Sequence, residues 1–262
     1  MDSPDIIRLS IFIAVLLLCA LWEWKMPRRR LSQNKTYRWA NNLGLVSLNS
    51  LCLSIFMPIL AFDAANIAQQ NSWGLMHAIK LPTLAEFFLG ILILDFVIYS
   101  QHLIFHKIPW LWRLHRMHHS DQDIDVTTGT RFHPIEIILS MWLKIAAIVL
   151  LGISPITVIV FEIILNASAM FNHSNARLSL DLDSLMRKII VTPDMHRVHH
   201  SRNPQETHSN FGFFLSIWDR CFNTYTDQPE LGHQGIKIGI TQFQTASEQR
   251  IDNMLTQPFR NH

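Results

Sequence analysis

The 262-residue sequence contains little cysteine and few charged residues, and it lacks several familiar cofactor motifs. Its three cysteines, Cys19, Cys52 and Cys221, are too few for a disulfide framework or a thiolate metal site. No glycine-rich loop of the kind that binds nucleotides or flavins is present, and no His-Glu-x-x-His motif of zinc proteases occurs. A formal net charge of +2 gives no indication of nucleic-acid binding. We therefore expect no nucleic-acid partner and no bound flavin or dinucleotide.

Apolar residues, by contrast, make up 49% of the chain, and they are gathered in long runs. The runs cover residues 6–24, 40–62, 84–105 and 135–164. Because about 20 apolar residues cross the hydrocarbon core of a bilayer, the first three runs predict one span each. The fourth run is interrupted at 152–155 and is long enough for a hairpin of two spans. The sequence therefore predicts an all-α fold, a multi-pass transmembrane helical bundle with four to five spans.

The distribution of basic residues predicts the orientation of this bundle, because Lys and Arg accumulate in cytoplasmic loops. With the N-terminus outside, 19 of the 22 Lys and Arg residues fall in segments predicted to be cytoplasmic. Arg8 and Lys144 are assigned to spans. The same cytoplasmic segments carry every cluster of histidines. We therefore expect an integral membrane protein whose active site lies on the cytoplasmic face.

Histidine is the abundant chemical group: 11 of the 14 histidines lie between positions 102 and 208. Residues at i, i+3 and i+4 share one face of a helix, so a box with such spacing can point its imidazoles at a common point. Three boxes have this spacing: His102 and His106; His115, His118 and His119; His196, His199 and His200. Eight histidines exceed the three or four ligands of a zinc site. Two metal ions would use them, and nitrogen ligands with few carboxylates suit an iron centre that activates O2.

The boxes and their neighbours resemble the fatty acid hydroxylase / sterol desaturase superfamily of integral membrane non-haem iron enzymes. The resemblance covers about residues 84–227. It rests on the segments around the three boxes (95–106, 114–120 and 192–201), on Phe132-His133-Pro134, and on 171–175, 208–212 and 218–220. We divide the chain accordingly into N-terminal membrane anchor spans (1–83), a hydroxylase-type catalytic domain (84–227) and a C-terminal tail (228–262).

The resemblance implies a bundle with a cytosolic helical cap that carries the histidine boxes, and a di-iron site between them. The eight box histidines are then the implied ligands, and His173, at the end of the last span, is a further one. Some lipid hydroxylases carry another histidine four residues earlier, where this chain has Ala169. His133 can supply that nitrogen, or it can have only a packing role beside Pro134.

The implied activity is oxidation of a C–H bond of a fatty-acyl, sterol or related lipid, by hydroxylation or desaturation. It requires two Fe ions, O2 as co-substrate and an external electron donor such as a cytochrome b5, a ferredoxin or a reductase. Two alternatives stay open. One is a metal-ion transporter or metal-binding membrane protein, and the other is a catalytically inactive family member that binds lipid.

Three carboxylates lie close to these motifs. Asp95 falls within a predicted span, where a carboxylate is unfavourable unless it is paired or faces a polar cavity. We expect Asp95 to help orient the iron site, by a bond to a histidine box other than its own. Asp194, two residues before His196, is a second candidate for this role, with N-capping after Pro193 as its alternative. Glu162 is expected to make a polar contact between helices.

Overall fold

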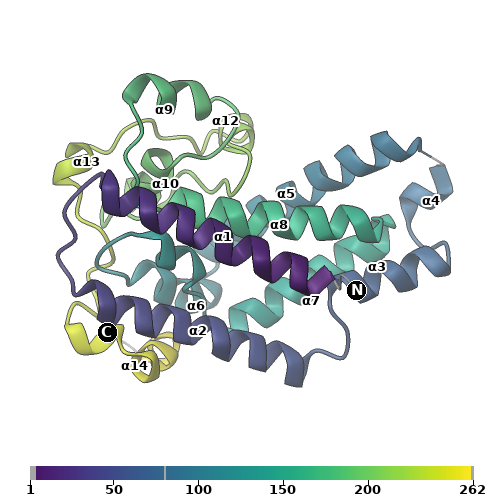
Figure 1. Ribbon diagram of the computed structural model, residues 1–262, viewed down its shortest axis with the longest axis horizontal. Coiled ribbons are helices and arrows are strands. Elements are labelled where there is room, and N and C mark those ends of the chain that lie inside the picture. Colours follow the sequence, from purple (N-terminus) through teal and green to yellow (C-terminus); the bar gives the residue numbers. More distant parts are fainter. Residues whose placement is uncertain (1–3, 80, 261–262) are drawn as a thin grey trace.

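A computed structural model of the chain describes residues 4–79 and 81–260, which form helices joined by loops, without β-strands. Five segments of it are long and apolar enough to cross a bilayer. They run along the long axis of the molecule (Figure 1). These segments are α1 (Pro4–Lys25), the region of α2 (Lys35–Phe56), α3 (Ala61–Gln70) and α4 (Leu75–Ile79), α5 (Thr83–Lys107), α7 (Pro134–Leu151) and α8 (Pro155–His173). The predicted all-helical bundle with four to five spans is confirmed.

The turns between these helices follow from proline and glycine. The fourth apolar run is a hairpin, as predicted: Gly152 ends α7 in the left-handed region at φ 71°, and Pro155 begins α8. The second run differs from the prediction of one span over 40–62, because α2 ends at Phe56 and α3 begins at Ala61. Pro58 lies between them, and proline cannot donate the backbone hydrogen bond that a continuing helix needs.

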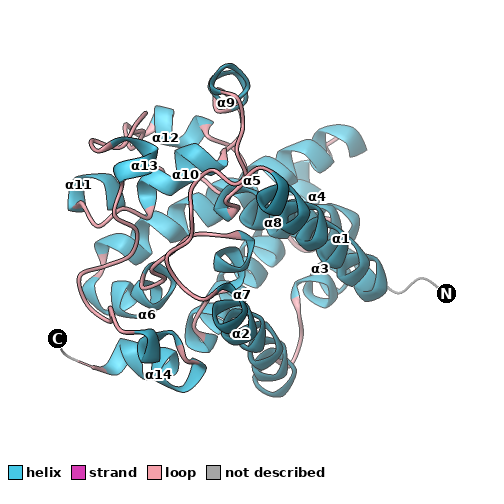
Figure 2. Cartoon of the chain, turned by 60° about the vertical axis from the view of Figure 1, so that its left-hand side comes forward, coloured by secondary structure: helices cyan, strands magenta, loops and turns pink. Residues whose placement is uncertain are grey.

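Shorter helices gather at the end of the bundle where α1 and α8 finish and α2 begins (Figures 1 and 2). We call this part of the molecule the cap. It contains α6 (Pro109–His119), α9 (Leu180–Met186), α10 (Pro193–His199), α11 (Pro204–Thr207), α12 (Ile217–Cys221), α13 (Gly232–Gly235) and α14 (Ile251–Thr256), together with 3₁₀ turns at Val126–Thr130, Ala246–Gln249 and Gln257–Phe259.

Buried polar contacts tie the cap to the N-terminal helices. Arg38 of α2, 1% exposed, donates to Asp121 at 2.7 Å and also pairs with Asp125. Burial opposes ionisation of Asp121, but the positive charge of Arg38 lowers the pKa of this carboxyl group to about 2. Glu23 of α1 accepts hydrogen bonds from the backbone N–H groups of Val126 and Asn175. The loops that follow α6 and α8 are thereby held in fixed positions.

Candidate metal centre

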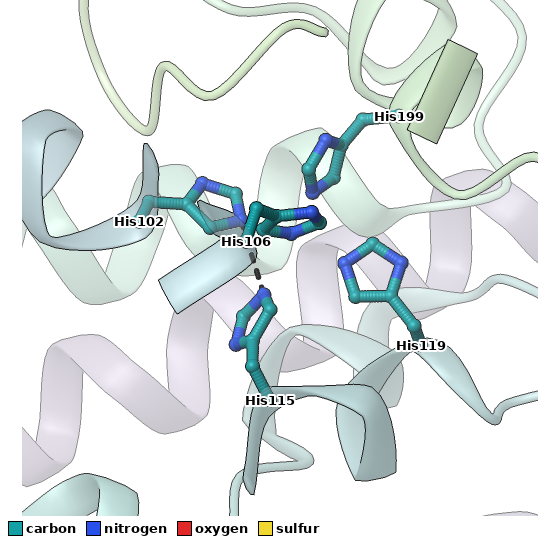
Figure 3. Close-up of side chains that lie close together, drawn as sticks. All are labelled: His102, His106, His115, His119 and His199. Carbon is teal, nitrogen blue, oxygen red and sulfur yellow. Dashed lines mark hydrogen bonds between the residues drawn. The ribbon is translucent and has the colours of Figure 1, made fainter. Parts of the chain in front are cut away.

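Nine histidines converge where the long helices meet the cap, and they form two groups. The first group consists of His102 and His106 of α5, His115 and His119 of α6, and His199 of α10 (Figure 3). The second group consists of His118 of α6, His173 of α8, and His196 and His200 at the end of α10. Within each group, one nitrogen of each ring lies within 4.8 Å of the corresponding nitrogens of the others.

The two groups share the histidine boxes between them. On α6, His115 and His119 lie at i and i+4 and face the first group, whereas His118 faces the second. On α10, His196 and its i+4 neighbour His200 belong to the second group. The sequence predicted that each box points its rings at a common point. The structure instead divides two of the three boxes, which places the two groups directly beside each other.

Hydrogen bonds in the first group leave two lone pairs facing each other. His102 Nδ1 donates to the carbonyl oxygen of Phe211 at 2.8 Å, and His115 Nδ1 donates to Glu136 Oε1 at 2.7 Å. Because a neutral imidazole carries a single N–H, the Nε2 atom of each of these rings is an acceptor. The two Nε2 atoms nevertheless lie 3.1 Å apart (Figure 3). A shared cation relieves the repulsion between two such lone pairs.

The second group repeats this arrangement. His118 Nδ1 donates to the carbonyl oxygen of Arg131, and His173 Nδ1 donates to that of Ala169. His173 Nε2 then lies 3.0 Å from His118 Nε2 and also 3.0 Å from His196 Nε2. Nitrogen ligands about 2.1 Å from one metal ion and at right angles to each other would be about 3.0 Å apart. The observed separations therefore fit neighbouring ligands of a single ion in each group.

The remaining nitrogens also fit metal ligation. His106, His119 and His200 have no hydrogen-bond partner for either ring nitrogen in the described part of the chain, although all three are buried. Such buried polar atoms normally have partners. Burial, followed by the charges of neighbouring histidines, lowers the pKa of His119 and His200 well below the usual value. Both rings are therefore neutral near pH 7, which is the form that binds metal.

Residues to which the sequence assigned no role hold these rings in place. Glu136 is the acceptor for His115, and the carbonyl oxygen of Ser209 is the acceptor for His199. Asp219 accepts from the backbone N–H groups of Phe211 and Gly212, so it fixes the loop whose carbonyl groups orient His102 and His199. Burial raises the pKa of Asp219 to about 6. A signal for Glu136 was present in the sequence, since it is a carboxylate at the start of an apolar run.

Asp95, Asp194 and His133 were predicted at or beside the site, and all three lie outside both groups. Asp95 accepts hydrogen bonds from the indole of Trp218 and the backbone of Leu215, and not from a histidine box. Asp194 pairs with Arg28 and Arg197.

The alternative role of Asp194 as an N-cap is wrong, because Thr192 caps α10. His133 Nδ1 accepts from the backbone N–H of Ile135 and caps α7, and its Nε2 faces the carbonyl oxygen of Leu255. Of its two possible roles, the structure therefore favours the structural one.

A cavity of about 490 Å³ begins at the first group and extends among the long helices. His102 and His115 line it, whereas no histidine of the second group does. Much of its wall is apolar. The long helices α1, α2, α5, α7 and α8 contribute Phe12, Leu53, Phe105, Ile137, Met141 and Leu165 among others, and the loop between α11 and α12 contributes Phe213. The volume lies within the range of about 300–1,000 Å³ that is usual for small-molecule sites. The first group is therefore the one that a ligand in the cavity can approach.

Three known proteins are similar to this chain over more than half of its length. The chain is 29% identical to alkylglycerol monooxygenase from Xenopus tropicalis over 93% of its own length and 52% of that protein. It is 28% identical to ornithine lipid hydroxylase OlsE from Rhizobium tropici over 88% of its own length and 70% of that protein. It is 24% identical to cholesterol 25-hydroxylase from Rattus norvegicus over 56% of its own length and 48% of that protein.

The chain thus spans about half the length of the alkylglycerol monooxygenase. No solved structure matches it. A family model described as fatty acid hydroxylase matches residues 87–224, the part that contains all nine histidines of the two groups. By this match the chain belongs to the fatty acid hydroxylase family.

Proposed function

We propose that this protein is an O2-dependent lipid hydroxylase whose two histidine groups each bind one iron ion. The observation that carries the proposal is the set of buried imidazole acceptors that face each other at about 3 Å in both groups. The cavity that reaches the first group supplies the second requirement, which is space for a substrate beside the metal.

When bound, the two iron ions would supply the activation of O2. One oxygen atom enters a C–H bond to give an alcohol, and the other leaves as water with two electrons and two protons. Since no flavin or dinucleotide motif is present, we propose that the electrons come from a separate protein such as a cytochrome b5, a ferredoxin or a reductase. The chain itself binds the lipid, keeps water from the reacting carbon, and holds the N–H of His115 on Glu136.

The relatives favour hydroxylation over desaturation and a lipid over other substrates. Their names describe a monooxygenase of alkylglycerols, a hydroxylase of ornithine lipids and a hydroxylase of cholesterol. The three substrates differ in headgroup and skeleton, so the lipid class is the part that we transfer to this chain. A metal transporter would be expected to hold its ligands near the middle of the membrane at broken helices. Here the ligands lie where α5 and α8 end, which favours the enzyme.

The decisive experiment compares metal content and lipid products of the wild-type protein with those of a His199→Ala variant. We expect two iron ions per wild-type chain and one hydroxylated lipid in the membranes that contain it. In the variant, whose first group keeps four histidines, we expect weaker binding of one iron ion and no oxidised lipid. His77→Ala, which alters a histidine of α4 outside both groups, is the matched control. A wild-type protein that binds both ions but oxidises no lipid would support the inactive lipid-binding alternative.

We also propose that the cap and the histidine groups lie on the cytoplasmic side of the membrane. The distribution of basic residues supports this orientation. Cys221 offers a direct test, since it is exposed at the end of α12 in the cap, whereas Cys19 is buried in α1. A membrane-impermeant maleimide should label Cys221 in inverted vesicles and not in intact cells. Labelling in intact cells would reverse the orientation.

A further inference from the structure

The end of the cavity away from the histidines carries a cluster of charged residues. Glu162 of α8 accepts a hydrogen bond from Lys144 of α7 at 2.9 Å and also pairs with Arg8 of α1. All three residues line the same cavity as His102 and His115. The predicted role of Glu162 as a polar contact between helices is confirmed. Three charges within the apolar bundle are nevertheless unusual, because a charge in a membrane span is unfavourable unless it is paired or functional.

The charges of this cluster do not balance on the side that faces the cavity. Two cations, Arg8 and Lys144, meet one carboxylate, that of Glu162. Asp5 also pairs with Arg8, but its side chain is 80% exposed and does not line the cavity. A helix contact alone would need only one cation for each carboxylate. The second cation therefore leaves an excess of positive charge at this end of the cavity, because Glu136, the other carboxylate of its lining, lies beside His115.

Lys144 also has hydrogen-bonding capacity that the chain does not use. Its ammonium group has three N–H donors, and among the described residues Glu162 accepts one hydrogen bond from it. The side chain is 11% exposed, so bulk water reaches it poorly. Asn166 and Gln101 line the same cavity and add amide groups to its wall. Donors and positive charge together suit a ligand group that is rich in acceptors and negatively charged.

We propose that Lys144 and Arg8 form a subsite for the acidic headgroup, a phosphate or a carboxylate, of the lipid substrate. Glu162 holds the two cations in place, and the lipid chain extends from them toward the first histidine group. Lys144 and Glu136 are eight residues apart on α7, which corresponds to about 12 Å along the helix. The subsite would then determine how far from the headgroup the oxidised carbon lies. This inference rests on the proposed function.

Binding to the full-length protein in a non-ionic detergent tests the subsite without any turnover. The probes are dodecyl phosphate, dodecanoate and dodecanol, which share one chain length and differ in charge. We expect the wild-type protein to bind both acidic probes about tenfold more tightly than dodecanol. A single hydrogen bond to a charged group strengthens binding by about this factor. Lys144→Met should abolish this preference, Lys144→Arg should retain it, and Lys25→Met, at an exposed position outside the cavity, should not alter it.

Lys144→Met leaves Glu162 with fewer partners and can destabilise the bundle. The triple variant Arg8→Met/Lys144→Met/Glu162→Gln removes all three charges, and we expect it to restore the thermal stability while the preference stays lost. Equal binding of dodecanol and the acidic probes by the wild-type protein would overturn the subsite, as would an unchanged preference in the triple variant.

Displacement of dodecyl phosphate by inorganic phosphate at equal concentration would overturn its assignment to a lipid. Failure of this subsite is distinct from failure of the proposed function, because hydroxylated lipid and bound iron are measured separately.

Discussion

The two histidine groups differ in the number of their members, in their support and in their access to the cavity. The first group has five histidines, and one of them, His115, donates to a carboxylate, that of Glu136. The second group has four histidines, and His118 and His173 donate to backbone carbonyl groups. A carboxylate partner raises the basicity of a ligand histidine more than a carbonyl group does. The cavity reaches His102 and His115 of the first group, whereas the histidines of the second group are buried and do not line it.

This difference indicates a division of roles between two sites that share α6 and α10. The first group combines five histidines, a carboxylate partner and contact with the cavity, which would suit the proposed iron ion nearest to the substrate. The second group has four histidines, which is the number of ligands in a metal site that has no open coordination position. Changes that affect one group at a time can therefore confirm this division or show that the two groups act as one.

The largest effect should come from removing one ligand from each group in turn. His119 and His200 are a matched pair: their rings are stacked with centroids 4.5 Å apart, and each belongs to a different group. We expect His200→Ala to leave about one iron ion per chain and to lower lipid oxidation by more than about a hundredfold, since losing a ligand weakens a site more than losing its support.

His119→Ala leaves four nitrogens in its group. This variant should keep both ions with a weakened affinity for the first. Elemental analysis of the purified variants and quantification of the hydroxylated lipid check both expectations. Equal iron content in the two variants would contradict the difference between five and four ligands.

A smaller effect is expected from changing Glu136, the carboxylate that accepts a hydrogen bond from His115 of the first group. Glu136→Gln keeps an acceptor for His115 Nδ1 but removes the negative charge. We expect the affinity of the first group for metal to fall by about tenfold, at the low end of the 10- to 100-fold range for such changes, while the second group is unchanged. Competition with a chelator should then remove one ion earlier than the other. Glu86→Gln, in the first turn of α5, is the control. A simultaneous loss of both ions would show that the groups are coupled.

The parts of this site that the sequence predicted are those fixed by local spacing. The i, i+4 pairs of α5, α6 and α10 predicted which rings share a face, and the apolar runs predicted where α7 and α8 turn. The division of the boxes of α6 and α10 between two groups depends on how these two helices pack together, which spacing does not determine. Asp95 illustrates the same limit, because its partners come from the cap, Leu215 from a loop and Trp218 from α12. Glu136 was missed because its partner His115 lies 21 residues away on another helix.

Acidification should affect both groups alike, since the rings of both groups are buried. Burial lowers the pKa of His119 and of His200 well below 6.5, so the unfolded chain binds protons below that pH while the folded chain does not. Stability is therefore retained above pH 6.5 and falls as the pH decreases below it. Because the folded rings are already neutral, metal binding displaces no proton from them, and the metal affinity of the folded chain should change little until the chain unfolds. Thermal unfolding and chelator titration between pH 7.5 and pH 5.5, as an approximate range, measure both effects. Loss of one ion well before the other would contradict this equal response.

The smallest effect concerns access to the first group from the bilayer. Ser50 of α2 lines the cavity, whereas the adjacent Leu51 is 55% exposed and does not line it. Ser50→Trp should narrow the cavity and lower the rate of lipid oxidation a few-fold, because it hinders the substrate without touching a ligand. Iron content should stay at the wild-type value. Leu51→Trp places the same side chain toward the lipid and should have no effect on either quantity. If both variants were fully active, a lipid would have to reach His102 and His115 by a path that does not pass α2, and the part of the cavity beside Ser50 would play no role in substrate entry.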